Sequence, residues 1–516
     1  MAAGLQARGV SHGDHVAVLG PTTPLLVTSL QAIWLTGATP VVLPLPMRLA
    51  SIEEFISSTK ARVRASDSVA VLIDPEFAPF VEVGPEDPPL YDLHALSPEV
   101  DNFSAAQFIR PDYQEDDLFI LQFTSGSTSE PKGVMLTNSA VSANLDAIAA
   151  AAQVDVNEDV LCSWLPLYHD MGLVGFCILP MSTGLDLVLG APQDFLARPA
   201  RWMEWISTYG ATATAGPNFS YVLATRALKR AKETLDLSRL RIALNGAEPV
   251  DPASVRSFIE AGERHSMRPG AVFPAFGMAE VAIAGCFPPP LRGLATDTVD
   301  ANALEKEYQA IPVDADHPDA REIVKLGSPV PGLEFRIVDP GTGEVLPERA
   351  VGELQITGTS LMSGYYKRPE ANEASFVDGW LHTGDLAYVV DGEMVMCGRI
   401  KDMIITGGRN VYPQDVERAI ADVDGVRAGN VIAFGVSDSR GKERLAVVAE
   451  TRSGDHDRII KEIHERVVHT VGVPCKDVAL VKPSSLPKTS SGKLQRALCK
   501  QQFKDGKLEL VEPESA

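Results

Sequence analysis

The chain of 516 residues has few cysteines, and their spacing excludes several kinds of site. No CxxC pair occurs, and no histidine stands near a cysteine at zinc-binding spacing. We therefore expect reduced, buried thiols of a cytosolic protein, with neither a disulfide framework nor a zinc site. The six residues are Cys162, Cys177, Cys286, Cys397, Cys475 and Cys499.

Positive charge is also scarce. The chain has 46 lysines and arginines against 68 aspartates and glutamates, which gives a formal net charge of −22. A field of this sign repels the phosphates of nucleic acids and the headgroups of anionic lipids. We therefore expect no nucleic acid and no anionic membrane surface as a partner.

Long hydrophobic runs are missing as well. The best candidate, residues 171–190, contains Pro180, Asp186 and four glycines, and it does not reach the ~18 uncharged apolar residues of a membrane-spanning helix. The N-terminus has neither the basic nor the apolar region of a signal peptide. The sequence predicts a cytoplasmic protein without stable membrane insertion.

What the sequence does contain is an alternation of strand-like and helix-like segments. Residues 14–20 and 39–45 are short β-prone runs, and residues 24–38 between them have helical apolar spacing. The same alternation recurs in the segments 200–216, 240–262 and 270–285, and in the last of them it predicts a helix at residues 278–285. The pattern predicts an α/β fold with mostly parallel, helix-covered sheets, in which ligands bind at the carboxyl ends of the strands.

The pattern of secondary-structure signals changes after about residue 330. Closely spaced strand and turn signals predict a small β subdomain up to residue 398, and the stretch beyond it alternates strands and helices as in a compact α+β unit. We expect a large N-terminal domain (1–398) of two α/β sheets plus the β subdomain, a hinge (399–402) and a small C-terminal domain (403–516). The first residues resemble the end of an amphipathic helix, so we expect a shortened N-terminus.

A loop rich in hydroxyl groups follows the strand predicted at residues 117–123. Its glycines permit close backbone approach, and its hydroxyls and lysine are groups that hold phosphate oxygens. The Walker pattern GxxxxGK[ST] is absent, and the composition alone equally suits a flexible Ser/Gly linker. The candidate phosphate-binding residues are Thr124, Ser125, Gly126, Ser127, Thr128 and Lys132.

Six segments resemble, in order, the motifs of the adenylate-forming enzymes, which include acyl-CoA ligases, peptide-synthetase adenylation domains, luciferases and fatty acyl-AMP ligases. They are FTSGSTSEPKGV (123–134), NGAEPV (245–250), FGMAE (276–280), HTGD (382–385), GRIKD (398–402) and PKTSSGKLQR (487–496). Each segment alone is a weak signal, whereas all six in the family's order are a specific one. The resemblance implies the acyl-CoA synthetase fold with a mobile C-terminal domain, and a reaction that joins a carboxylate to the α-phosphate of ATP.

The resemblance also implies a role for the polar residues of these motifs. Lys493 would be the catalytic cation at the attacking carboxylate and the α-phosphate, because this reaction depends on positioning and charge stabilisation. Glu280 would be a catalytic residue that binds Mg²⁺, with Thr124 as a second metal contact, and Asp385 would accept hydrogen bonds from the ribose hydroxyls. The remaining ATP-binding candidates are Asn245, Gly246, Ala247, Glu248, Pro249, Phe276, Gly277, Met278, Ala279 and Arg399, and the hinge candidates are Lys401 and Asp402.

Residues 162–175 resemble the segment of the fatty acyl-AMP ligases that borders the acyl tunnel and the α-phosphate. The resemblance makes His169 a catalytic candidate, although a lone histidine is more often a satisfied core residue. Residues 215–228 resemble the entry of the acyl-pocket helix in the same enzymes. The acyl-pocket candidates are Trp164, His169, Asp170, Met171, Gly172, Asn218 and Phe219.

The residues before Asp385 depart from the fatty acyl-AMP ligases. Many of these enzymes carry an insertion there that keeps the C-terminal domain from the pose that uses CoA, whereas residues 376–385 run straight through. We expect activation of a medium- or long-chain fatty acid with ATP and Mg²⁺, then transfer to the phosphopantetheine thiol of a holo acyl carrier protein, as in siderophore acylation of the mycobactin kind. A fatty acyl-CoA ligase, a luciferase-like oxygenase and an inactive acyl-binding protein are the alternatives.

Overall fold

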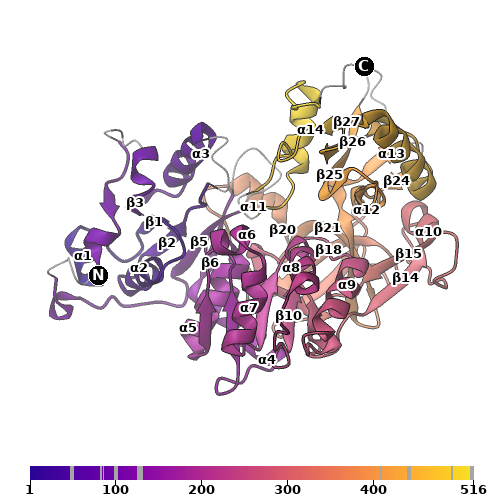
Figure 1. Ribbon diagram of the computed structural model, residues 1–516. Coiled ribbons are helices and arrows are strands. Elements are labelled where there is room, and N and C mark those ends of the chain that lie inside the picture. Colours follow the sequence, from indigo (N-terminus) through magenta and orange to yellow (C-terminus); the bar gives the residue numbers. More distant parts are fainter. Residues whose placement is uncertain are drawn as a thin grey trace.

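A computed structural model describes residues 1–46, 52–81, 84, 86–97, 103–124, 132–406, 409–437, 443–489 and 492–511 of the chain. Figure 1 shows the C-terminal part, in orange to yellow, at the upper right above the middle of the chain, and the N-terminal elements, in indigo, at the left. The predicted α/β fold, with a large N-terminal part and a small C-terminal part, is confirmed.

The N-terminal sheet forms because short β-branched strands alternate with a well-capped helix. The side chain of Thr23 accepts a hydrogen bond from the backbone N–H of Leu26, and Pro24 occupies the first helical position. The four strands are parallel, in the order β2-β1-β3-β4, so the βαβ unit predicted for residues 14–45 is confirmed. The elements are α1 (Ala2–Ala7), β1 (His15–Leu19), α2 (Pro24–Leu35), β2 (Thr39–Val42), α3 (Ile52–Ala65), β3 (Ser68–Ile73) and β4 (Leu90–Asp92).

A second sheet of five parallel strands, in the order β11-β10-β9-β7-β8, lies at the centre of the molecule. Trp202 on α7 donates from Nε1 to Thr214 Oγ1 on β9 at 2.8 Å, which fastens one covering helix to the sheet. Because the carboxyl ends of parallel strands meet at one edge, the segments after β7, β9 and β10 come together there. The elements are α4 (Asn138–Ala151), β7 (Val160–Ser163), a π-helix (Met171–Ile178), α5 (Leu179–Thr183), β8 (Asp186–Leu189), α6 (Pro192–Ala197), α7 (Ala200–Tyr209), β9 (Ala213–Gly216), α8 (Asn218–Arg230), β10 (Ile242–Asn245), α9 (Pro252–Glu263) and β11 (Val272–Pro274).

The helix implied for residues 278–285 was a wrong prediction. This stretch makes a single 3₁₀ turn (Ala279–Val281) and then the second strand of an antiparallel hairpin, β12 (Phe276–Gly277) with β13 (Ala284–Phe287), which β16 (Ser328–Pro329) extends. A Cβ atom on Gly277 would lie 1.9 Å from the carbonyl oxygen of Ile283, so the two strands approach too closely there for any larger residue. A run of eight residues, seven of them small or apolar, carries too little periodicity to distinguish the two structures.

The strand predicted at residues 117–123 is confirmed, but its partner is antiparallel. It is β5 (Leu118–Thr124), which pairs with β6 (Lys132–Thr137), and β19 (Gly364–Tyr365) adds a third strand. The hydroxyl-rich loop therefore connects the two strands of a hairpin, and its flanking residues Thr124 and Lys132 face each other across the ladder. Residues 125–131 lie outside the described part of the chain.

The β-rich region after residue 295 contains two further sheets. An antiparallel pair, β14 (Thr296–Asp300) and β15 (Ala320–Val324), carries the short helix α10 (Ala301–Lys306) between its strands. A five-stranded sheet follows in the region predicted as the β subdomain. It contains β17 (Leu333–Val338), β18 (Gly352–Gly358), β20 (Phe376–Val377), β21 (Trp380–Val390) and β22 (Glu393–Arg399), with α11 (Pro369–Ser375) beside it.

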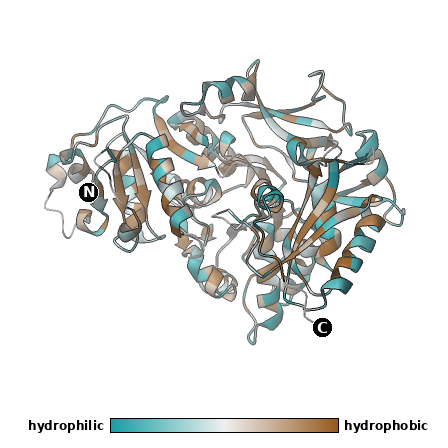
Figure 2. Cartoon of the chain, turned by 90° about the horizontal axis from the view of Figure 1, so that it is seen from above, coloured by the Kyte–Doolittle hydropathy of each residue, from teal (hydrophilic) through white to brown (hydrophobic). Residues whose placement is uncertain are grey.

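The C-terminal part has its own core. One face of α13 buries Ile459, Ile463, Val467 and Val471, which are spaced by four residues along the helix, against the sheet β25-β26-β27. Figure 2 shows these strands largely brown, with helices that are teal on one side. The elements are β23 (Ile404–Thr406), β24 (Arg409–Val411), α12 (Pro413–Ala421), β25 (Val426–Ser437), β26 (Glu443–Thr451), α13 (His456–Val471), β27 (Cys475–Val481) and α14 (Arg496–Lys504).

All six cysteines are buried and free, in agreement with their scattered spacing. Among the residues that the structure describes, no helix is both long enough and apolar enough to cross a membrane.

Candidate active site

A cleft of about 3200 Å³ lies between the C-terminal part and the carboxyl edge of the central sheet. Asn245 and Gly172 were predicted at the site but do not line this cleft, and Ser125, Gly126, Ser127 and Thr128 lie outside the described residues. The other predicted residues all line it: Thr124, Lys132, Trp164, His169, Asp170, Met171, Asn218, Phe219, Gly246, Ala247, Glu248, Pro249, Phe276, Gly277, Met278, Ala279, Glu280, Asp385, Arg399, Lys401, Asp402 and Lys493.

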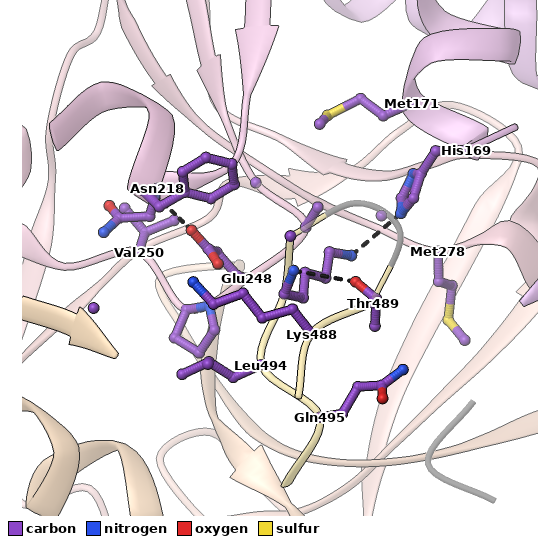
Figure 3. Close-up of a pocket in the computed structure, with 18 of the residues that line it drawn as sticks. His169, Met171, Asn218, Glu248, Val250, Met278, Lys488, Thr489, Leu494 and Gln495 are labelled. Atoms are coloured by element: carbon purple, nitrogen blue, oxygen red, sulfur yellow. Dashed lines mark hydrogen bonds between the residues drawn. The ribbon is translucent and has the colours of Figure 1, made fainter. Parts of the chain in front are cut away.

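Lys493 enters the cleft on a tight turn of the C-terminal part. A bridge between Lys488 and Leu494 closes the turn, and Thr489 both donates its N–H to the carbonyl of Lys493 and accepts the Lys493 N–H at its hydroxyl. Gly492 has a φ of +89°, a conformation that residues with a side chain seldom adopt. The turn aims Lys493 so that its Nζ lies 3.4 Å from Nε2 of His169, a contact that Figure 3 marks by the dashed line from the labelled His169.

Charges of both signs surround the ammonium group of Lys493. Burial lowers its pKa, while the carboxylates of Asp170 and Glu248 oppose that shift. Asp170 pairs with Nδ1 of His169, and although burial raises the pKa of Asp170, its neighbours His169 and Lys493 hold it below the usual range. The Asp170 side chain also accepts the N–H of Met171 at 2.7 Å, so the segment after β7 is fixed where it meets Lys493.

The segments after β9 and β10 are joined by side-chain hydrogen bonds. Glu248 Oε1 accepts the backbone N–H of Phe219 at 2.6 Å, and both residues border the cavity in which Figure 3 shows Lys488. Asn218 Oδ1 accepts bonds from Asn245 Nδ2 and Ser254 Oγ, each at 3.1 Å. The amide groups of Asn218 and Asn245 thus connect α8, β10 and α9.

Glu280 has a partner that the sequence did not reveal. Its Oε1 accepts a hydrogen bond from the hydroxyl of Tyr365 at 2.9 Å, and burial raises the pKa of the Glu280 carboxyl. The Nζ of Lys132 lies 4.6 Å from the centre of the Tyr365 ring. The edge strand β19 therefore connects the end of the hydroxyl-rich loop to Glu280, and nothing in the local sequence around Tyr365 signalled this contact.

Asp385 and Arg399 meet because β21 and β22 pair in a register that places them opposite each other. Arg399 Nε lies 2.8 Å from Asp385 Oδ1, and this carboxylate raises the pKa of the Arg399 guanidinium. Asp385 itself is 4% exposed. The pair presents one carboxylate and one cation at the cleft, and its Arg399 is the first residue of the predicted hinge.

The predicted hinge, residues 399–402, includes a single 3₁₀ turn (Ile400–Asp402). Asp402 Oδ2 accepts a bond from Arg496 Nη1 at 3.1 Å, and Arg496 Nη2 also donates to Glu417 Oε1 at 2.7 Å. Arg496 lies in the last of the six motifs but was not singled out from the sequence. It ties the hinge to two elements of the C-terminal part.

The cleft contains carboxylates but no preformed metal cage. Among the described residues, no cluster of three potential metal ligands occurs. Mg²⁺ binds few protein carboxylates when phosphate oxygens and water complete its shell. Glu280, with a hydroxyl donor on one oxygen, therefore fits an ion that arrives with the phosphates of a nucleotide, and it does not fit a permanently held ion.

Two family models match the chain. The model described as AMP-binding enzyme matches residues 1–366, and the model described as AMP-binding enzyme C-terminal domain matches residues 408–500. The chain belongs to the AMP-binding enzyme family, whose members form adenylates, and it is a ligase of this kind.

Individual relatives agree with this family. A Mycobacterium tuberculosis protein named only as a ligase is 38% identical over 509 residues, which are 96% of this chain and 91% of the relative. The medium-chain-fatty-acid–[acyl-carrier-protein] ligase JamA of Moorena producens is 36% identical over 432 residues, or 80% of this chain and 72% of JamA. A solved structure from a study of fatty acyl-adenylate ligases of E. coli and L. pneumophila superposes with a TM-score of 0.89 at 32% identity, covering 98% of this chain and 90% of that one.

Proposed function

We propose that the protein activates a medium- or long-chain fatty acid with ATP and Mg²⁺ and passes the acyl group to the phosphopantetheine thiol of an acyl carrier protein. The observation that carries this proposal is that Lys493 reaches the same cleft as Glu280 and Asp385, although it belongs to the C-terminal part. A cation, a carboxylate suited to Mg²⁺ and a ribose-binding carboxylate are the groups that adenylation of an acid requires.

In the first step the fatty acid carboxylate attacks the α-phosphorus of ATP, an acyl phosphate anhydride bond forms, and pyrophosphate leaves. Lys493 stabilises the negative charge that gathers between the carboxylate and the α-phosphate. His169 holds the Lys493 ammonium at 3.4 Å and is itself oriented by Asp170. Glu280, with Thr124 beside it, would hold Mg²⁺, which would supply positive charge to the phosphates of ATP.

The proposed nucleotide site occupies the rest of the polar wall. Asp385 accepts hydrogen bonds from the ribose hydroxyls, with Arg399 as its countercharge at 2.8 Å. The adenine lies against residues 246–249, and residues 276–279 border the phosphates. Ser125, Gly126, Ser127, Thr128 and Lys132 hold the phosphate oxygens, as their hydroxyl, backbone and ammonium groups suit.

The acyl chain needs an apolar wall, and the cleft has one. Trp164 lines it and stacks on Phe195 with ring centres 3.8 Å apart, which fixes the orientation of the indole. Phe176, Leu179 and Leu223 line the same cleft. A wall of this kind supports a fatty acid as the substrate, in line with the acids named for JamA and for the structural neighbour.

In the second step the thiol of the carrier protein attacks the acyl carbon, a thioester forms and AMP leaves. We propose that the C-terminal domain (403–516) rotates about Lys401 and Asp402 between the steps, so that Lys493 withdraws and the thiol can enter. The name of JamA supports a carrier protein as the acceptor. The free thiols of all six cysteines suit a reaction in the cytoplasm.

One experiment tests both steps. The protein is incubated with ATP, Mg²⁺ and lauric acid, and the products are measured without an acceptor, with CoA and with a holo carrier protein. We expect pyrophosphate and acyl-adenylate in every case and acyl transfer to the carrier protein alone. Rapid formation of acyl-CoA would instead favour the fatty acyl-CoA ligase, and absence of pyrophosphate with all acids from acetate to palmitate would overturn the proposed activity.

A further inference from the structure

The C-terminal part rests on α10 and β15, a region that lies outside the catalytic motifs. Arg409 on β24 donates from Nη2 to Asn302 Oδ1 at 2.6 Å, and Asn410 Nδ2 donates to the carbonyl of Glu305 at 2.8 Å. Figure 1 shows α10 and the pair β14–β15 beside β24 and α12 at one end of the molecule. Arg321 and Gln414 of this contact also line the cleft in which Lys493 lies.

An arginine of β15 stands at the centre of the contact. Arg321 Nε lies 3.2 Å from Asp415 Oδ1, with the two side chains 10% and 11% exposed. Its guanidinium carbon lies 4.5 Å from the centre of the Tyr412 ring. Arg321 thus binds two residues of the C-terminal part by a charge and by a cation–π contact, both shielded from water.

Tyr412 is a C-terminal residue that packs into the core of the β-rich region. It is 1% exposed and belongs to a buried cluster that includes Val299, Leu304 and Tyr388. Its ring also lies against the first residue of the GRIKD motif, because a Cβ atom on Gly398 would be 3.0 Å from Tyr412 Cδ1. Rotation about residues 399–402 therefore has to move Tyr412 relative to Arg321.

The contact is buried, but several of its polar atoms lack a hydrogen-bond partner. Among the residues that the structure describes, Arg321 Nε and Nη1, the hydroxyl of Tyr412 and Oε1 of Gln414 are buried without a hydrogen-bond partner, so the approach of Nε to Asp415 is an ion pair without a hydrogen bond from Nε. Such groups gain water when the surfaces separate, which offsets part of the interaction that is lost. The same contact can therefore hold the C-terminal part in place and still be released within a catalytic cycle.

We propose that Arg321 is a positioning residue for adenylation: through Asp415 and Tyr412 it holds the C-terminal part in the arrangement that places Lys493 in the cleft. The proposal rests on the two-step function above, because only the first step needs this arrangement. Acyl transfer requires the contact to separate. Loss of Arg321 should therefore slow the first step and leave the second intact or faster.

The test measures the two half-reactions separately in the full-length chain. Arg321→Gln should lower the rate of pyrophosphate release about tenfold or more, as for the loss of one partner of a buried pair. Transfer from supplied lauroyl-adenylate to the holo carrier protein should stay within about twofold of the parent or rise. Arg256→Gln is the matched control, since Arg256 is 54% exposed and pairs with Glu322, the next residue of β15, and it should change neither rate.

A second single variant and a double variant distinguish loss of this contact from a general folding defect. Asp415→Asn should reproduce the selective loss, and the double variant with Arg321→Gln should be no slower than the slower single variant, because both changes break one contact. Equal loss of both half-reactions, additive losses or parent-like rates would overturn the proposal.

A distance measured between the two parts of the chain distinguishes a failure of this proposal from a failure of the proposed function. Spin labels are placed on Val156→Cys and Val468→Cys. Val156 is 51% exposed and Val468 is 48% exposed, whereas the six native cysteines are buried. At a pH below about 7, the distance distribution should be narrow in the parent and broad in Arg321→Gln. If the parent makes no adenylate but the distribution is broader in Arg321→Gln than in the parent, the proposed function fails and the role of Arg321 in holding the two parts together stands. If the distribution is the same in both proteins, the role of Arg321 is overturned.

Discussion

At the scale of the residue, Lys493 combines two opposing influences. Burial lowers the pKa of its ammonium group, and the nearby carboxylates of Asp170 and Glu248 oppose that shift. Nε2 of His169 lies 3.4 Å from Nζ of Lys493. The site therefore holds a cation in a partly dry cleft, where its effect on a developing negative charge is larger than in water.

Removing that cation should abolish the first step selectively. We expect Lys493→Ala to reduce pyrophosphate release about 100-fold or more, the usual cost of losing one group that stabilises the transition state, while acyl transfer from supplied adenylate persists. Lys482→Ala, at an exposed position of the same part of the chain, should retain both activities. The role assigned to Lys493 is excluded if the two alanine variants adenylate at the same rate.

The pKa of Lys493 also predicts how adenylation depends on pH. The reaction needs the charged form, and a lowered pKa means that this form is lost at a lower pH than for an ordinary lysine. The rate of pyrophosphate release should thus fall on the alkaline side with an apparent pKa below the ordinary lysine value. Lys493→Arg, which stays charged, should shift that fall to higher pH, and an unshifted profile would assign it to another group.

At the scale of the element, the turn that carries Lys493 depends on the backbone of one glycine. Gly492 has a φ of +89°, and a Cβ atom there would meet Phe219 only at 3.5 Å, an ordinary contact. Any effect of Gly492→Ala therefore comes from backbone strain of about 1 kcal/mol, with little steric conflict. We expect adenylation to slow about threefold to tenfold as the turn shifts.

Gly506→Ala is the matched control for this change. Gly506 has a φ of +65° in the same part of the chain, with no atom within 4 Å of its would-be Cβ. Both variants should lower the midpoint of thermal unfolding by a similar amount, but only Gly492→Ala should slow pyrophosphate release. Equal rates in the two variants would mean that the turn does not position Lys493.

At the scale of the whole molecule, the arrangement of the two parts should depend on pH through Glu305. This residue is 4% exposed, and burial together with Asp415 raises its pKa to about 7, against the opposing charges of Arg409, Arg321 and Lys306. The observed arrangement therefore binds a proton more tightly than one in which Glu305 faces water. Its extra stability is complete below the ordinary glutamate pKa and is lost as the pH rises through about 7.

The spin-label pair at positions 156 and 468 measures this effect. We expect the distance distribution to broaden as the pH rises through about 7, and Glu305→Gln, which cannot ionise, to keep the narrow distribution over the whole range. A parent distribution that does not change with pH would show that Glu305 does not control the arrangement.

Prediction from the sequence brought together side chains that lie in three distant motifs. Lys493, Glu280 and Asp385 were named from their own short motifs and all three line one cleft, while their roles stay predictions. Tyr365 was missed because its contact with Glu280 spans 85 positions of sequence, and no local pattern encodes such a pairing. The helix predicted at 278–285 failed for a related reason, since the approach of Gly277 to Ile283 decides that hairpin.

The sequence by itself determined the family, the alternation of strands and helices and the set of reactive side chains, because each of these depends on neighbouring residues. The tertiary structure alone decided that the hydroxyl-rich loop closes a hairpin, that Arg496 ties the hinge to α12, and that Arg321 meets Asp415 across the two parts. The physical reason is that side chains far apart in sequence meet only after the sheets have packed, and the free energy of those contacts depends on burial that no single segment produces.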